Sequence, residues 1–325
     1  MTISIASERH LERWDSFVDR SVNGTIFNKR RFLAYHGDKF KDGERFLVIM
    51  NGTEVYAQIA LYTFIDERGV KTSNSPYGAS YGGFIFKEVP TYKSGNEIVN
   101  LFLSYLNENR VQQCFIRQPA GIFCAQSMDT FIFNLLEAGF VSVNREIFNY
   151  MVIADECPVI DMIPNAACRT QIRKAIKSGV YVNQDAPLDD AWPLIQRTIQ
   201  RFGKEPTHNR DELKTLKDTF PESIRFIVAY HDGIPIASVT SIALNKTVNS
   251  AFYLSTDERY LKLNALRCTL ERAIQQAQDN GYKHYDFGTS STMLTAGPNI
   301  FAFKEEFSRS GMFRETLRWE KSQHD

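Results

Sequence analysis

Three polar side chains in the C-terminal half of the chain could stabilise charge or carry a proton in a reaction. Lys304 lies in the segment FAFKEEF, and an ammonium aimed at a developing oxyanion stabilises it. Asp286, on the predicted strand HYDFGTS, could take a proton from an amine or orient it. His208, in the polar loop GKEPTHNR, is a natural general base near neutral pH.

Each of these residues also has an ordinary structural interpretation. Lys304 could pair with a neighbouring glutamate on a helix surface. Asp286 could cap the turn that Gly288 and Thr289 begin, a role that the turn residues favour. His208 could be a solvated loop residue, since histidines in loops often are. The residue pattern leaves both interpretations open for all three.

A basic stripe is a candidate binding surface. Arg169, Arg173 and Lys177 are spaced by four residues, so a helix would place all three on one side. Guanidinium groups bind phosphate through two parallel hydrogen bonds, which suits a diphosphate-linked substrate or coenzyme A. A solvated helix face explains the same charges.

A glycine–aromatic run, SPYGASYGGF over residues 75–84, is a second candidate binding segment. Its glycines permit close backbone approach to a ligand, and Tyr77 and Tyr81 would offer flat contact surfaces and hydroxyl groups. Tyr253 is the corresponding candidate in the second half of the chain. A bent strand with packed aromatic side chains would give the same pattern.

An internal repeat indicates the elements that would position these residues. Residues 45–61 and 225–244 each read as two β-rich segments joined by a turn, at Asn51-Gly52 or Asp232-Gly233. Further strands, a helix, a strand, a helix and a last strand follow both hairpins, and helices precede them. This order predicts an α+β architecture. We place the boundary in the aperiodic stretch 155–165, which gives domains 1–158 and 159–325.

The repeated order of elements resembles two tandem GNAT (N-acetyltransferase) domains. Three segments are similar to motifs of the Fem-like branch, which includes peptidoglycan-bridge peptidyltransferases and relatives from polysaccharide gene clusters: RTQIRKAIKSGV at 169–180, NGYKHYDFGTS at 280–290, and NIFAFKEEF at 299–307. The YGG run at 81–83 also fits relatives. The resemblance implies two GNAT-like domains, each a mixed, mostly antiparallel sheet flanked by helices. It also implies that Lys304 lies near the reaction centre.

The chain departs from the family pattern in places that concern the acyl donor. The segment DERYLKLN, residues 257–264, lacks the glycines of a GNAT pyrophosphate loop, which disfavours coenzyme A in the second half. Ser308 replaces a usual glycine, and there is no coiled-coil insertion of the kind that holds aminoacyl-tRNA. Because the chain is also neutral overall, acyl-CoA is the favoured cofactor and aminoacyl-tRNA the alternative partner.

Composition excludes several other classes. Lysine plus arginine and aspartate plus glutamate number 38 each in 325 residues, so no net charge attracts DNA. There is no signal-peptide pattern and no apolar run of the roughly 18 residues that span a membrane. Scattered cysteines without metal-ligand spacing predict no metal and a reducing cytoplasm. Nucleophile-elbow, P-loop, dinucleotide-binding and zinc-protease motifs are missing.

These observations predict a cytoplasmic N-acyltransferase. It would move an acyl or aminoacyl group to an amine on a nucleotide- or lipid-linked sugar or peptide precursor in bacterial cell-envelope biogenesis, in polysaccharide or peptidoglycan biosynthesis. Two alternatives stay open: an aminoacyl-tRNA-dependent peptidyltransferase, and a non-catalytic binding protein with a degenerate GNAT fold.

Overall fold

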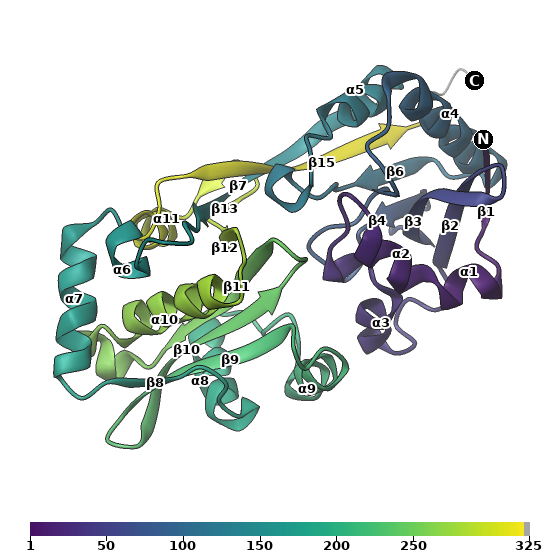
Figure 1. Cartoon of the computed structure of the whole chain (residues 1–325). Coiled ribbons are helices and arrows are strands. Elements are labelled where there is room, and N and C mark those ends of the chain that lie inside the picture. The colour runs from purple at the N-terminus through teal and green to yellow at the C-terminus, as the bar shows by residue number, and fades with distance from the viewer. Residues whose placement is uncertain (322–325) are drawn as a thin grey trace. The chain divides into compact units, whose positions relative to one another are not determined.

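The computed structural model describes residues 1–321, which form two compact units. Unit 1 comprises residues 1–146 and the C-terminal segment that begins at Phe313, and unit 2 comprises Ile147–Met312. The chain passes from unit 1 into unit 2 within strand β7 (Val141–Val152) and returns within β15 (Gly311–Glu320). Figure 1 shows this return as a yellow strand among the blue elements of unit 1.

Unit 1 is built on a mixed sheet with the strand order β1-β2-β3-β4-β6-β15, followed by the first half of β7. Strands β4 and β6 are parallel neighbours, whereas β1–β2, β2–β3, β3–β4 and β6–β15 pair antiparallel. The strands before β7 are β1 (Thr2–Ile5), β2 (Glu44–Asn51), β3 (Glu54–Ile65), β4 (Lys71–Ser75), β5 (Ile85–Phe86), which pairs with β3, and β6 (Gln113–Ile116).

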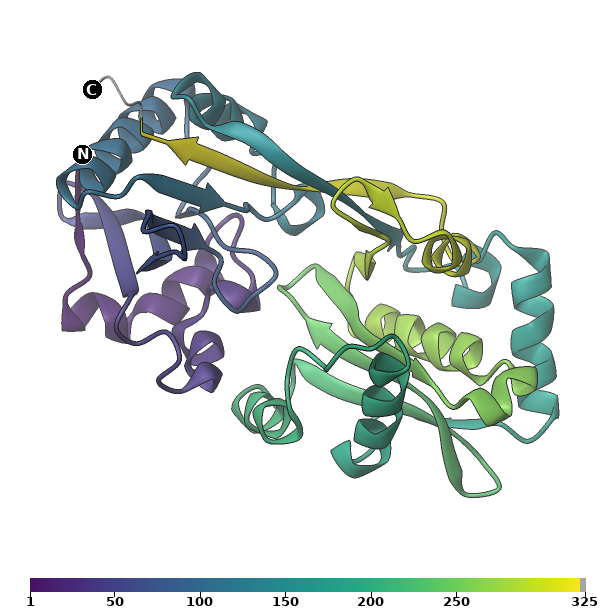
Figure 2. The ribbon, with the colours of Figure 1, turned by 180° about the vertical axis from the view of Figure 1, so that it is seen from behind.

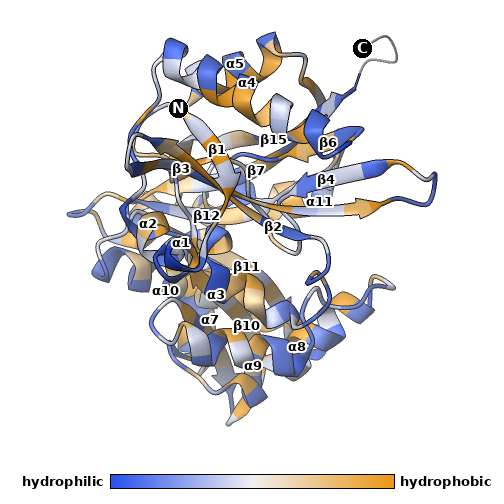
Figure 3. Ribbon diagram, turned by 90° about the vertical axis from the view of Figure 1, so that its right-hand side faces the viewer, coloured by the Kyte–Doolittle hydropathy of each residue, from blue (hydrophilic) through white to orange (hydrophobic). Residues whose placement is uncertain are grey.

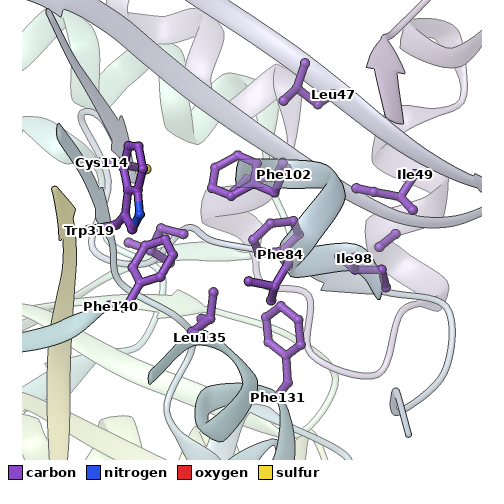
Figure 4. Packing of buried hydrophobic residues seen from close by; sticks show 14 of the residues in the cluster. Leu47, Ile49, Phe84, Ile98, Phe102, Cys114, Phe131, Leu135, Phe140 and Trp319 are labelled. Carbon is purple, nitrogen blue, oxygen red and sulfur yellow. The ribbon is translucent and has the colours of Figure 1, made fainter. Parts of the chain in front are cut away.

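Helices cover both faces of this sheet. One face packs against α4 (Tyr92–Glu108) and α5 (Asp129–Glu137), whose hydrophobic and hydrophilic residues alternate along the helices in Figure 3. Phe84 lies at the centre of this core, with its ring centroid 5.0 Å from that of Phe102 and 5.3 Å from that of Phe131 (Figure 4). The other face carries the short elements α1 (Glu8–Glu12), α2 (Trp14–Arg20), η1 (Ile26–Asn28), α3 (Arg30–Leu33) and η2 (Ala34–His36), and η3 (Gly121–Phe123) follows β6.

The strands of unit 2 form the other part of the mixed sheet, with the order β7-β12-β11-β10-β9-β8, to which β7 contributes its C-terminal half. Again one pair, β11 with β12, is parallel. The strands are β8 (Tyr181–Asn183), β9 (Ile224–His231), β10 (Ile234–Ala243), β11 (Val248–Thr256) and β12 (His284–Thr289), and β13 (Ser291–Thr292) and β14 (Thr295–Ala296) form a small hairpin. The turn between β9 and β10 has positive φ at Asp232 and Gly233, as the sequence predicts.

Two helical layers enclose the sheet strands of unit 2 (Figures 1 and 2). Helix α10 (Ala265–Asp279) packs on one face and α8 (Leu188–Gln200) on the other, so we call these the α10 face and the α8 face. The remaining helices are α6 (Val159–Met162), α7 (Ala166–Lys177), α9 (Arg210–Thr219), η4 (Glu258–Leu263) and α11 (Pro298–Glu305). No helix in residues 1–321 combines the length and apolar character needed to cross a membrane.

The boundaries of the two compact units differ from those of the domains 1–158 and 159–325 that we proposed from the sequence. That proposal follows the repeated order of elements, whereas compactness follows strand pairing. Strand β15 pairs with β6, and its Trp319 packs in the core of unit 1, while β7 pairs with β12 in unit 2. Each sequence repeat therefore places its last strand beside strands of the other repeat. The predicted α+β fold, a large mixed and mostly antiparallel sheet flanked by helices, is confirmed.

Candidate functional site

The two parallel strands of unit 2 separate at the predicted site. Strands β11 and β12 are in register only from Val248 and His284 to Ser250 and Asp286. Strand β11 then continues to Thr256 paired with β10. In open mixed sheets, the carboxyl ends of parallel strands that part from each other are a common place for ligands. The candidate residues of this unit can be located relative to that point.

A β-bulge decides which side chains share a face there. Thr240 lies opposite Tyr253 and Ser241 lies opposite Ala251, so Phe252 is an extra residue in β11. Side chains alternate along a regular strand, and one extra residue shifts that alternation by one. Ser250 and Tyr253 consequently both point to the α8 face, although they are three positions apart.

Asp286 is buried, with 4% of its surface exposed, and its carboxylate is held on that same face. One oxygen accepts a hydrogen bond from the Ser250 hydroxyl at 2.8 Å. The other accepts one from the backbone N–H of Gly288 at 2.7 Å. The second bond is the turn cap that the sequence favours. Ser250 has no recognisable signal in the sequence NSAFYLST, so sequence reasoning did not include it.

Lys304 is also buried at 4% exposure, on helix α11. Its ammonium donates to the carbonyl oxygens of Gly288 at 2.7 Å and Thr289 at 2.6 Å. The neighbouring carboxylate of Glu306 binds Arg267 instead, at 2.6 and 2.7 Å. Lys304 is therefore not the solvated helix lysine that one interpretation expects. It meets Asp286 at the Gly288 turn, where φ is +71°.

His208 and Tyr253 form a buried pair. The loop before α9 places the His208 side chain at 2% exposure, with Nδ1 2.9 Å from the Tyr253 hydroxyl. The backbone N–H of His208 donates to the same hydroxyl at 3.2 Å. Burial raises the pKa of Tyr253 to about 12, so the phenol is neutral at physiological pH. A solvated loop histidine is thus excluded, and two candidates proposed separately are neighbours.

The basic stripe lies on α7, at the edge of unit 2 in Figure 1. This helix packs Cys168, Ile172 and other apolar residues towards α10. Arg169 is half-buried and donates from Nη1 to the carbonyl oxygen of Ile163 at 2.6 Å, which fixes the turn before the helix. Arg173 and Lys177 are exposed. Phosphate binding by this stripe stays a prediction. One guanidinium nitrogen of Arg169 already donates to a backbone carbonyl oxygen.

Tyr77 and Tyr81 belong to unit 1, where both are buried in aromatic packing. Burial, together with the nearby carboxylate of Glu44, raises the pKa of Tyr77. The Tyr81 ring lies 4.8 Å from Phe123.

The glycines of this run also serve packing. A Cβ at Gly78 would lie 1.9 Å from His36 Nε2, and one at Gly83 would lie 2.5 Å from Gln118 Oε1. The side chains of His36 and Gln118 therefore occupy the space directly beside these two glycines. Ligand contact by Tyr77 and Tyr81 stays a prediction.

A polar groove of about 470 Å³ in unit 1 contains residues that sequence reasoning missed. It lies along β4, β6 and β15, and its lining includes Arg68, Asn74 and Arg117. Burial and the neighbouring Arg314 lower the pKa of Arg117, while Glu146 opposes that shift. The available signal was a cationic residue at the end of an apolar strand, QCFIR, two positions before a proline.

The segment between β11 and α10 does not fit the diphosphate of coenzyme A. A diphosphate loop binds its ligand through several unoccupied backbone N–H groups. Here the N–H of Arg259 donates to Asp257 at 3.0 Å, and those of Tyr260 and Asn264 donate to backbone carbonyls within the segment. The Arg259 guanidinium is also bound to Asp257. Among residues 1–321, no group of three or more histidine, cysteine or acidic side chains could hold a metal ion.

Residues 166–304 match a family described as "Acetyltransferase (GNAT) domain". Over its whole length, the structure is similar to the crystal structure of FemX, with a TM-score of 0.75, 12% identity, and coverage of 100% of this chain and 98% of FemX. This chain therefore shares the fold of FemX, and its residues 166–304 match the GNAT acetyltransferase domain.

Two other solved structures share the tandem fold. A tandem GNAT protein from the clavulanic acid biosynthesis pathway gives a TM-score of 0.55 at 10% identity, with 100% of this chain and 99% of that chain covered. The C-terminal domain of a putative lysylphosphatidylglycerol synthetase from Agrobacterium fabrum gives 0.60 at 10% identity, with 95% and 91% covered. No curated protein matches this chain in sequence.

Burial also protects the cysteines of this GNAT protein, which gives a direct test of its packing. Burial raises the pKa of Cys168 to about 12 and that of Cys268 to about 11. It also raises the pKa of Cys124 to about 12 and that of Cys114 further. Since the thiolate is the reactive form, we expect a disulfide reagent at pH 8 to modify about one thiol of the native protein, Cys157. Denatured protein should show all five. If native Cys157→Ser protein still reacts quickly with the reagent, another thiol is accessible, and the burial of the other four cysteines is contradicted.

Proposed function

We propose that unit 2 catalyses direct transfer of an acyl or aminoacyl group to an amine. The observation that carries the proposal is the bulge at Phe252, which puts the Ser250–Asp286 and Tyr253–His208 pairs on one face where β11 and β12 part. Holding amine and acyl carbonyl together there would supply much of the rate enhancement through proximity.

The buried pair provides a route for the proton. The amine nitrogen attacks the acyl carbonyl carbon, and the tetrahedral intermediate then carries a proton to be removed from that nitrogen. In the tautomer with Nδ1 of His208 unprotonated, the Tyr253 oxygen takes this proton while the phenolic proton passes to Nδ1. The oxyanion then re-forms the carbonyl, the bond to the leaving sulfur or oxygen breaks with its electron pair, and the amide is formed. The leaving anion takes up the proton that the relay holds.

Charge on the intermediate needs hydrogen-bond donors. The residue added by a bulge is left out of the strand ladder, so the Phe252 backbone N–H is a candidate donor at this point of β11. Lys304 is the other candidate, as the family resemblance implies. Its two bonds to Gly288 and Thr289 also support a positioning role for the turn that holds Asp286.

We propose a nucleotide- or lipid-linked sugar or peptide of the bacterial cell envelope as acceptor, in polysaccharide or peptidoglycan biosynthesis. The exposed cations Arg173 and Lys177 support a phosphorylated acceptor. The fold similarity to FemX and to a putative lysylphosphatidylglycerol synthetase supports a role in the envelope. A cytoplasmic location fits such precursors.

The proposal has two versions, which differ in the molecule that donates the acyl group. Acyl-CoA is the usual donor of GNAT enzymes and is favoured by the sequence. The occupied N–H groups of residues 257–264 favour an aminoacyl ester carried by tRNA instead. Incubation with acetyl-CoA or with aminoacyl-tRNA, each with a nucleotide-linked amino sugar or peptide, distinguishes the two by the product formed. Absence of amide product with both donors would count against acyl transfer.

Variants of the pair test the proton route. We expect Tyr253→Phe to lower kcat about 100-fold, because it removes the hydroxyl between amine and histidine. His208→Asn should have a similar effect, and the double variant should lose little more, since the two act as one unit. Tyr181→Phe, at an exposed tyrosine of the same unit, is the matched control and should keep full activity. Additive losses in the double variant would exclude the relay.

A further inference from the structure

A second cavity lies in unit 1 on residues that the proposed function does not use. It is a groove of about 590 Å³ between the helices α1 and α2 and the β2–β3 hairpin. This volume is within the range of small-molecule sites. Its lining includes the cations Arg9, Arg13, Arg20 and Lys87, and the carboxylate of Glu54.

The charges of α1 and α2 are separated between two sides. Asp15 and Asp19 point away from the groove and pair with Arg31 and Lys29 at 2.8 and 2.7 Å. The groove arginines follow at positions 9, 13 and 20, which fall on the other side of a nearly continuous helical path. Acidic and basic residues of these helices therefore do not neutralise one another.

The positive charge in the groove is not balanced by its lining. Glu54 is paired with Lys87 through a hydrogen bond. Within residues 1–321, no carboxylate lies within ion-pair distance of Arg9, Arg13 or Arg20. Three like charges around one cavity repel one another, and an anion that binds between them removes this repulsion. Because the chain as a whole has no net charge, the excess of positive charge is a local property of this groove.

The floor of the groove is apolar. Val48 is 1% exposed, and Met50, Val55 and Phe17 are half-buried beside it. A bare inorganic anion or a nucleic-acid backbone gains nothing from such a floor, whereas an apolar chain gains free energy as its surface leaves water. Cations above an apolar floor therefore suit a ligand that has both an anionic group and an apolar chain.

We propose that this groove binds a phosphorylated amphiphile, with the phosphate or diphosphate between Arg9, Arg13 and Arg20 and the apolar chain along Val48, Met50 and Val55. Guanidinium groups suit the phosphate because each can donate two parallel hydrogen bonds. The ligand class is a prenyl phosphate or diphosphate, and binding here is independent of acyl transfer in unit 2.

Calorimetry on the full chain tests this with three probes: geranyl diphosphate, inorganic pyrophosphate and UDP. We expect geranyl diphosphate to bind at least about tenfold more tightly than pyrophosphate, since its chain leaves water. UDP should bind no better than pyrophosphate. Arg13→Gln/Arg20→Gln should weaken geranyl diphosphate binding at least about tenfold, because two charge-assisted contacts are lost.

Two controls distinguish this groove from other cationic surfaces. Lys93→Gln/Arg110→Gln removes two exposed charges elsewhere in unit 1, and Arg173→Gln/Lys177→Gln removes the exposed α7 cations. Both should leave the affinity unchanged. The proposal is overturned if pyrophosphate or UDP binds as tightly as geranyl diphosphate, if the groove variant binds normally, or if only the α7 variant loses binding. The last result would support the proposed acceptor site instead.

Discussion

Glu146→Gln is expected to lower the free energy of unfolding of unit 1 by about 3–5 kcal/mol, the usual cost of removing one partner of a buried ion pair. Glu146 is buried, with 8% of its surface exposed. Its carboxylate accepts hydrogen bonds from Nε and Nη2 of Arg314 at 2.9 and 2.6 Å. Arg117, whose pKa burial and Arg314 lower, depends on the same negative charge. The amide would leave two largely buried guanidinium groups without a counter-charge. Urea unfolding followed by circular dichroism measures the change.

The adjacent strand positions provide a matched control. Arg145 and Glu315 form an ion pair of similar geometry at 2.7 Å, but 52% of the Arg145 side chain and 24% of the Glu315 side chain are exposed. A solvated pair contributes at most about 1 kcal/mol, so Glu315→Gln should change the unfolding free energy by no more than that. Equal losses in the two variants would show that burial does not set the strength of these pairs.

Lys304→Met is expected to affect both stability and turnover. The ammonium donates to two part-buried carbonyl oxygens, and leaving such acceptors without a donor costs up to about 1–3 kcal/mol each. We therefore expect the free energy of unfolding of unit 2 to fall by about 2–6 kcal/mol in total. Turnover should drop at least about tenfold, because the Gly288 turn and any donor to the oxyanion are both lost.

Separate measurements distinguish these two roles. Lys246→Met, at an exposed lysine of the same unit, should change neither property. Activity should be measured where the folded fraction of each variant is known from its unfolding curve. Normal turnover of folded Lys304→Met would remove this lysine from the mechanism, and unchanged stability would show that its two carbonyl contacts contribute little.

The local elements of this chain follow from its sequence with little help from tertiary structure. The Asp232-Gly233 turn needs positive φ at both positions, and only a few residue types adopt it readily. Gly281 lies one position beyond the C-cap of α10 with φ of +77°, as expected for a residue that ends a helix. The repeat of such signals was sufficient to predict an α+β fold in two copies.

The candidate site could be predicted only in part. The sequence indicated Lys304, Asp286, His208 and Tyr253 as separate candidates, because their chemistry is visible in the residue type. It did not indicate Ser250, since serine on a strand is common and carries no signal. It also suggested ligand contact for Tyr77, which the structure buries among aromatic rings.

By itself, the sequence determined the secondary structure, its duplication and the types of side chain available for acyl transfer, because helical periodicity and turn preferences act over a few residues. Only the tertiary structure decided that β7 and β15 pair with strands of the opposite repeat, and that Phe252 is an extra residue in β11. Strand register depends on partners distant in sequence. One additional residue in a strand reverses the direction of every side chain that follows, and this reversal places Tyr253 on the same face as Ser250 and Asp286.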